Sequence, residues 1–211
     1  MDRLTLFDTP ILVIQIADAD ETNHVLADRF AREAREDLGI QQSNVGGWHS
    51  VPNLSTRDDP MLDDLMELFA ESATVALGEF AKRVDTEAWP DYELGLQAWA
   101  MVMNNGDYTI CHDHAESHLS GVYYVDAGDA DLDQHPNSGL LAFQDPRGSL
   151  QHIPGLELYP STFTVRPETG LLVIFPGFLT HYVHPYAGAR PRTSVSFNIR
   201  VEPVPPTAVS Q

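Results

Sequence analysis

The sequence predicts a mainly β protein with helices in its N-terminal part, and three observations support this prediction. Residues 1–92 contain two segments with helical periodicity. The residues from Glu93 onward fall into short apolar or alternating runs, and turn signals separate these runs. Many short strands joined by turns are typical of an antiparallel sandwich or barrel, so we expect the helices to cover one outer face of the sheet structure.

The N-terminal segment predicts one short strand followed by one helix. Residues 11–16 form an apolar run of strand length. Asp18 and Asp20 are candidate N-caps for a helix that runs to about Asp37, and Gly39 is placed to end it.

A second helix is predicted to begin with Asp59 as its N-cap and Pro60 at its first position. Its apolar residues recur at helical spacing, at Leu62, Leu65, Met66, Phe69, Ala73, Ala76, Leu77 and Phe80. This pattern indicates an amphipathic helix that packs on a larger structure. The glycine-rich loop at residues 46–50 lies between the helices, and we interpret its Trp48 as a buried residue rather than a substrate contact.

The β part follows from runs separated by glycine, proline, asparagine and aspartate. We expect strands at residues 94–103, 119–125, 140–143, 163–166, 171–175 and 194–201. Asn104 and the segment 145–147 are interpreted as turn residues. The whole chain of 211 residues is expected to form one domain, with a helical buttress at 1–92, a β core at 93–203 and a flexible tail at 204–211.

Composition excludes several classes of protein. Cys111 is the only cysteine, so an internal disulfide or a cysteine-based zinc cluster is excluded. The formal charge of −19 disfavours nucleic acid and anionic membranes as partners. No segment approaches the roughly 20 apolar residues of a membrane-spanning helix, and the N-terminus does not read as a signal peptide. A cytoplasmic location is therefore expected.

Two histidine-bearing segments are candidates for metal binding. His112 and His114 precede the run at 119–125, and residues two apart on a strand project from the same face. The alternative is a solvated polar strand end, and His118 is interpreted as a surface residue. The second segment places His181 after an apolar run and a Pro-Gly turn, with Arg192 at the start of the next run.

The two segments together resemble the 2-oxoglutarate and Fe(II)-dependent dioxygenases, and in particular a bacterial subgroup with His-x-His and Leu-Ser-Gly-Val-Tyr-Tyr motifs. The stretches that carry the resemblance are residues 112–114, 119–124, 145–147, 175–185 and 192–198. The resemblance covers about residues 95–200 and implies a double-stranded β-helix, a cupin-like jelly roll whose open end holds the metal.

The resemblance also implies roles for residues of the candidate metal site. His112 and His181 match the two histidines of the family's facial triad, whereas His114 stands where most members have aspartate. A neutral imidazole at that position leaves one more positive charge on the site. If a bulge reverses the facing of the strand, Asp113 supplies the carboxylate instead.

In this resemblance, Arg192 corresponds to the family arginine that pairs with the distal carboxylate of 2-oxoglutarate. A guanidinium suits this role because it can bind a carboxylate through two parallel hydrogen bonds. Ser194 faces the same way and can add a hydroxyl. Tyr124 matches a tyrosine that the family places against the same carboxylate. An equally good interpretation is that Tyr124 is an ordinary aromatic residue of the β core. Arg190 is the alternative to Arg192 for binding this carboxylate; otherwise it is interpreted as an exposed turn residue.

The implied activity is an Fe(II)- and 2-oxoglutarate-dependent oxygenase that uses O2, oxidises an unidentified small-molecule or peptide substrate, and releases succinate and CO2. We assign no catalytic residue beyond the metal site. Two alternatives stay open: a cupin-like three-histidine metalloenzyme that does not use 2-oxoglutarate, and a non-catalytic jelly-roll binding or sensor module. Monomer and homodimer also both stay open.

Overall fold

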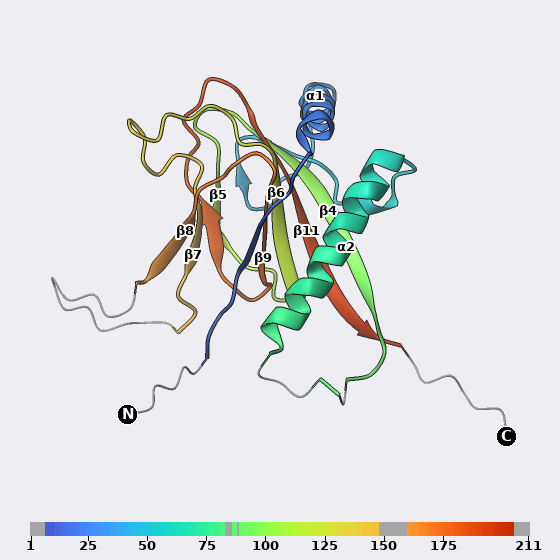
Figure 1. Cartoon of the computed structure of the whole chain (residues 1–211). Helices are drawn as coiled ribbons and strands as arrows, with labels where there is room; N and C mark the ends of the chain where they lie inside the picture. Colours follow the sequence, from blue (N-terminus) through green and yellow to red (C-terminus); the bar gives the residue numbers. More distant parts are fainter. Residues whose placement is uncertain (1–6, 83–85, 88, 148–159, 205–211) are drawn as a thin grey trace.

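The computed structural model describes residues 7–82, 86–87, 89–147 and 160–204. The strands of these residues form two antiparallel sheets, and both helices lie on the same side of them (Figure 1). The predicted mainly β fold with N-terminal helices is therefore confirmed. One of the histidines, His152, and the predicted tail residues 205–211 lie outside the described residues.

The larger sheet has six strands in the order β1-β9-β6-β11-β4-β3. Its strands are Leu12–Gln15 (β1), Leu171–Pro176 (β9), Leu119–Asp126 (β6), Arg192–Pro203 (β11), Tyr92–Met103 (β4) and Trp48–His49 (β3). The long strands β4 and β11 pair over their full length, from Arg192 opposite Met103 to Pro203 opposite Tyr92. We call this layer the six-stranded sheet.

The smaller sheet has five strands in the order β2-β5-β10-β7-β8. Its strands are Asn44–Val45 (β2), Tyr108–His112 (β5), His181–Val183 (β10), Leu141–Gln144 (β7) and Thr162–Val165 (β8). We call this layer the five-stranded sheet. Its central strand β10 is short, and it brings the two histidine-bearing segments together because His181 lies opposite His112.

The helices are α1 (Asp20–Glu36) and α2 (Pro60–Phe80), and a short 3-10 helix at Leu54–Thr56 precedes α2. The predicted start of α2 is confirmed: the Asp59 carboxylate accepts hydrogen bonds from the backbone N–H groups of Met61 and Leu62.

The predicted caps of α1 are wrong. Its N-cap is Ala19, which has no side chain that can cap the helix, and Asp20 is already the first helical residue. Asp18 instead occupies a left-handed turn, with φ of 55°. Gly39 does not end the helix either, because the C-cap is Asp37. Its own role is close packing, since a Cβ at Gly39 would lie 2.4 Å from the backbone oxygen of His49.

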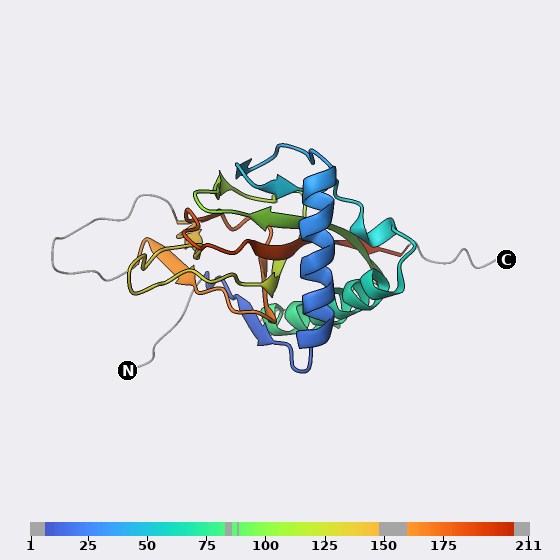
Figure 2. The ribbon, with the colours of Figure 1, turned by 90° about the horizontal axis from the view of Figure 1, so that it is seen from above.

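The helices bury the outer face of the six-stranded sheet, as expected. Leu26 and Phe30 of α1 and Phe69 of α2 are fully buried against residues of β4, β6 and β11. We call this layer the outer core. It includes the predicted apolar face of α2, of which Leu62, Leu65, Phe69, Ala73 and Ala76 are buried and Met66, Leu77 and Phe80 are half-buried. Figure 2 shows α1 lying across the strands beneath it.

A second set of buried side chains, which we call the inner core, fills the space between the two sheets. It contains Tyr124 of β6, Met101 and Met103 of β4, and Phe143 of β7. Strand alternation explains the division, because neighbours along β4, β6 and β9 belong to the outer and inner cores in turn. The candidate site occupies the same space.

All seven predicted strands occur within a few residues of their expected bounds. Four short strands were not predicted: β2, β3, β5 and β10. Trp48 is buried, with 7% exposure, which confirms its interpretation. Within the described residues, no helix is both long and apolar enough to cross a membrane.

Candidate active site

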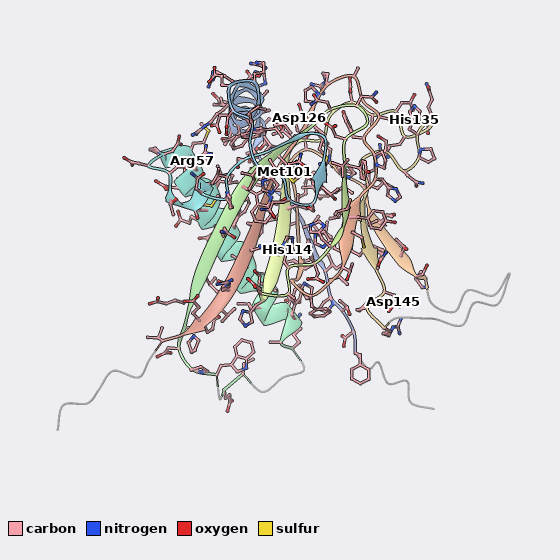
Figure 3. All side chains as sticks on the ribbon, turned by 180° about the vertical axis from the view of Figure 1, so that it is seen from behind. Arg57, Met101, His114, Asp126, His135 and Asp145 are labelled. Atoms are coloured by element: carbon pink, nitrogen blue, oxygen red, sulfur yellow. The ribbon has the colours of Figure 1, made fainter. Side chains whose placement is uncertain are left out.

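The structure brings the three predicted histidines together between the sheets. His112 ends β5 and His181 begins β10, so the antiparallel pairing of these strands sets the two residues opposite each other. One ring nitrogen from each of His112, His114 and His181 lies within 4.8 Å of the others. The His112 and His181 ring centroids are 4.4 Å apart, and His114 is 5.1 Å and 5.2 Å from them. Figure 3 shows His114 and Met101 between the two layers.

The expectation that a shared strand face brings His112 and His114 together is wrong. Because β5 ends at His112, His114 lies in the following loop and does not share a strand face with it. The loop is held by the turn at Gly177, whose carbonyl accepts a hydrogen bond of 2.8 Å from the N–H of His114. A Cβ at Gly177 would lie 2.2 Å from the Ser117 carbonyl, so this close approach requires glycine.

Asp113 lies outside the histidine group. Its side chain is exposed, and its carboxylate accepts a hydrogen bond of 3.2 Å from the backbone N–H of Ala115. The group of ligand atoms that lie within 4.8 Å of one another contains the three histidines and does not include this carboxylate. The geometry therefore favours His114 over Asp113 as the third candidate ligand.

Two of the imidazoles are oriented by backbone carbonyls. The Nδ1 atom of His112 is 2.8 Å from the carbonyl oxygen of Ile110, and the Nδ1 atom of His181 is 2.8 Å from that of Leu179. A carbonyl oxygen can only accept, so each Nδ1 carries the proton and each Nε2 offers its lone pair. This is the tautomer of a histidine that binds a metal through Nε2.

Burial also keeps these imidazoles neutral. It lowers the pKa of His181 to about 3 and the pKa of His114 to about 4, and it lowers the pKa of His112 as well. The neighbouring histidines lower the pKa values of His181 and His114 further. At neutral pH the lone pairs are therefore available to a cation, without competition from protons.

Arg192 lies in the same pocket and is almost completely buried, with 1% exposure. Its Cζ atom lies 4.8 Å from the centroid of the Tyr124 ring, and its Nη1 donates to the Met103 sulfur at 3.3 Å. No carboxylate among the described residues forms an ion pair with it, and its Nε has no hydrogen-bond partner there. A buried guanidinium without a counterion is costly, so it indicates a site for an anionic ligand.

Tyr124 and Ser194 complete this end of the pocket. They lie opposite each other in the pairing of β6 and β11, and both are buried. The Tyr124 hydroxyl has no hydrogen-bond partner among the described residues, and burial raises the pKa of the phenol, which therefore remains a protonated donor. All six predicted site residues thus line one pocket.

Five other polar residues, three of them histidines, do not line this pocket. Arg190 is exposed, with its guanidinium near the carboxylates of Asp126 and Asp129. His118 is exposed and accepts a hydrogen bond from the backbone of Val201. His135 is exposed in a loop away from the site (Figure 3), His184 packs on Tyr182, and Asn104 is an exposed turn residue.

Sequence reasoning missed three residues around His114. The ring centroid of Trp99 lies 5.9 Å from that of His114, and the His49 ring stacks on Trp99 at 5.5 Å between centroids. The Nδ2 atom of Asn198 lies 3.5 Å from the Nδ1 atom of His114. Asn198 could have been found by extending the alternation of Arg192 and Ser194 along the same strand, whereas the His49 and Trp99 contacts depend on strand pairing.

Comparisons with known proteins agree with this geometry. Residues 97–198 match the family model described as "Putative 2OG-Fe(II) oxygenase". No curated protein matches the chain by sequence. Over residues 97–198 the chain is therefore similar to the 2OG-Fe(II) oxygenases.

Three solved structures share the fold. A prolyl-4-hydroxylase from Pseudomonas putida has 15% identity and a TM-score of 0.59, over 90% of this chain and 91% of that one. A prolyl hydroxylase from Trichoplax adhaerens, in complex with a hypoxia inducible factor peptide fragment, has 12% identity and a TM-score of 0.59, over 90% and 83%. HygX from Streptomyces hygroscopicus, with nickel and 2-oxoglutarate bound, has 12% identity and a TM-score of 0.57, over 93% and 83%. The jelly-roll prediction is confirmed.

Proposed function

We propose that this protein binds Fe(II) through His112, His114 and His181 and oxidises a small-molecule or peptide substrate at the expense of 2-oxoglutarate and O2. One observation carries the proposal: three neutral imidazoles and a buried guanidinium that has no counterion among the described residues line the same pocket. The first feature fits a divalent metal, and the second fits a carboxylate.

The donor set suits iron. Imidazole nitrogen is a common ligand of Fe(II), and three protein ligands leave coordination positions for a bidentate cosubstrate and for O2. With His114 in the place of a carboxylate, all three ligands are neutral and the metal keeps its full double charge. That charge favours a dianionic cosubstrate.

Arg192, Tyr124 and Ser194 are the proposed partners of the distal carboxylate of 2-oxoglutarate. A carboxylate there would neutralise the buried guanidinium and accept from the Tyr124 hydroxyl, two groups that have unmet hydrogen-bonding capacity in the structure. The apolar side chains of the inner core would exclude water from this end of the pocket.

The substrate is expected to approach His114 from outside the barrel. Two open grooves meet at this residue and share Gln97, Asp113 and Asn198. Bound Fe(II) would supply the redox chemistry that couples 2-oxoglutarate, O2 and a C–H bond to succinate, CO2 and a hydroxylated product. The protein's part is to hold both reactants in place and to keep water out.

The proposal can be tested by reconstituting the protein anaerobically with Fe(II), adding 2-oxoglutarate and O2, and measuring succinate with and without candidate substrate pools. We expect one iron per chain and iron-dependent succinate formation. His181→Ala should lose both, whereas His184→Ala, a neighbouring histidine outside the pocket, should keep both. Iron binding without succinate under every condition would contradict the proposal.

That contrary result would favour a second candidate function, a three-histidine metalloenzyme that does not use 2-oxoglutarate. The observation in its favour is the third imidazole, His114, which lies where a carboxylate ligand is usual. The buried Arg192 argues against it, because such an enzyme has no distal carboxylate to bind. A chain that binds no metal at all would instead support a binding or sensor module.

A further inference from the structure

Asn198 lies next to the one candidate ligand that no backbone carbonyl orients. It belongs to β11, and its amide Nδ2 is 3.5 Å from the Nδ1 atom of His114. The Nδ1 atoms of His112 and His181 each face a backbone carbonyl, but His114 lies in a loop and faces this side chain instead. The amide is thus placed where the other two ligands have an oxygen.

The orientation of the amide decides which nitrogen of His114 can bind a metal. If Nδ2 faces Nδ1, the amide donates, the proton of the imidazole sits on Nε2, and no lone pair is left for a metal. A rotation of the amide plane by about 180° exchanges its two ends and sets Oδ1 opposite Nδ1. The imidazole then donates from Nδ1, and Nε2 is free.

Hydrogen bonding within the protein does not choose between these orientations. The Oδ1 atom of Asn198 has no partner among the described residues, and the exchange would leave Nδ2 in that place instead. The metal does choose, because only the second orientation gives all three histidines the same tautomer, with Nδ1–H bonded to an oxygen.

We propose that Asn198 is a positioning residue for the metal site: its Oδ1 accepts the Nδ1–H of His114 and thereby directs the Nε2 lone pair at the metal. This inference rests on the proposed iron site. A loop-borne ligand needs such a partner more than a strand-borne one. The backbone of His114 is fixed by Gly177, whereas its ring lies beside the rings of Trp99, His112 and His181, which offer it no oxygen acceptor.

The test compares the metal affinity of Asn198→Ala and Asn198→Asp with that of the unaltered protein. Co(II) serves as the probe, titrated against a chelator without 2-oxoglutarate, and its absorption spectrum reports the number of ligands. Asn198→Ala should weaken Co(II) binding by about 10–100-fold, the usual effect of losing such a partner. Asn198→Asp should bind at least as tightly as the unaltered protein, because a carboxylate accepts but does not donate.

A matched control is Arg200→Ala, two residues further along the strand, whose side chain is exposed and pairs with Glu116. It should leave the affinity and the spectrum unchanged. The melting temperature of each metal-free variant separates a positioning effect from a loss of folding, since Asn198→Asp should restore metal affinity only if the residue acts as an acceptor.

Two results would overturn the inference. Undiminished Co(II) affinity in Asn198→Ala would show that His114 needs no partner, and an equal loss in both Asn198 variants would show that the amide acts as a donor or only fills space. Neither result touches the iron site itself. If the unaltered protein bound no metal, the proposed function would fail instead, so the two failures are distinguishable.

Discussion

The two faces of β11 differ sharply in chemistry although they alternate along one strand. Val195, Phe197 and Ile199 are fully buried in the outer core, under the helices. Arg192 and Ser194 line the pocket on the inner face, as does Ser196, and Asn198 contacts His114. One strand thus supports the fold with one row of side chains and holds the site with the other.

The difference shows how the fold tolerates a costly site. The inner face carries the buried Arg192 guanidinium, and the neighbouring strand β6 contributes the buried Tyr124 hydroxyl. Both groups have hydrogen-bonding capacity that the described residues do not meet, which disfavours the folded state in the absence of a ligand. The outer face offsets this cost with apolar packing. Substitutions on the outer face should therefore change stability, whereas those on the inner face should change ligand binding.

The largest expected loss of stability comes from Phe69→Ala. Phe69 is fully buried and stacks on Phe197 at 4.2 Å between ring centroids. Removing such a ring typically costs about 3–5 kcal/mol, which for a chain of this size is a fall in melting temperature of roughly 6–20 °C. Thermal unfolding measures this.

The matched control on the same helix is Val75→Ala, whose side chain is 54% exposed and whose substitution should change the free energy of unfolding by less than about 0.5 kcal/mol. An unchanged melting temperature in Phe69→Ala would contradict the stabilising role of the outer core, because it would mean that α2 contributes little to the stability of the fold.

A smaller loss is expected from Gly121→Ala. A Cβ at this position in β6 would lie 2.3 Å from Cζ of Phe197, so the ring would have to shift within a full outer core. Overpacking of this kind costs about 1–3 kcal/mol. In Gly78→Ala, the same change on α2, the new methyl group meets nothing within 4 Å and should stabilise the helix by about 0.4–1 kcal/mol. Equal effects at the two glycines in chemical denaturation would contradict this account.

A third expected effect is a pH dependence of stability that originates on the inner side. In the metal-free protein, burial holds the pKa of His181 at about 3 and that of His114 at about 4, below the ordinary value of 6.5. As the pH falls below 6.5, the unfolded chain takes up protons that the folded chain does not. The free energy of unfolding should therefore fall, by at most about 1.4 kcal/mol per pH unit for each histidine, until the folded-state pKa values are reached.

Denaturant titrations of the metal-free protein between pH 7 and about pH 4.5 would measure this slope. His181→Gln should make it shallower, because one titrating group is removed. A slope unaffected by that substitution would place the pH dependence elsewhere in the molecule.

Periodicity was sufficient to predict the long elements. The apolar spacing of α2, its Asp59 cap, and the alternating runs of β4, β6, β9 and β11 all occur as expected, because each buries one face of a regular element. The strands β5 and β10 were missed, since both are short and owe their pairing to each other rather than to a local pattern.

The sequence predicted some site residues for the correct structural reason and others for a wrong one. Arg192, Ser194 and Tyr124 meet because β6 and β11 pair with Ser194 opposite Tyr124, a pairing that the sequence did not predict. His112 and His114 meet because of a loop held by Gly177, which a strand-facing rule does not describe. Asn198 continues the alternation of Arg192 and Ser194 along β11, whereas Trp99 has no motif of its own and lies beside His114 because β4 pairs with β11.

The central claim, that the inner face of β11 holds the cosubstrate, is tested most directly by an anaerobic titration of Fe(II)-loaded Arg192→Ala and Val195→Ala with 2-oxoglutarate, following the absorption of the iron chelate. Arg192→Ala should keep its iron and bind 2-oxoglutarate at least about a hundredfold more weakly, since losing one side of a buried charge pair costs about 3–5 kcal/mol and each 1.4 kcal/mol is tenfold. Arg192→Lys should recover part of the loss. Val195→Ala, from the outer core, should bind normally and melt at a lower temperature. Unchanged affinity in Arg192→Ala would contradict the account.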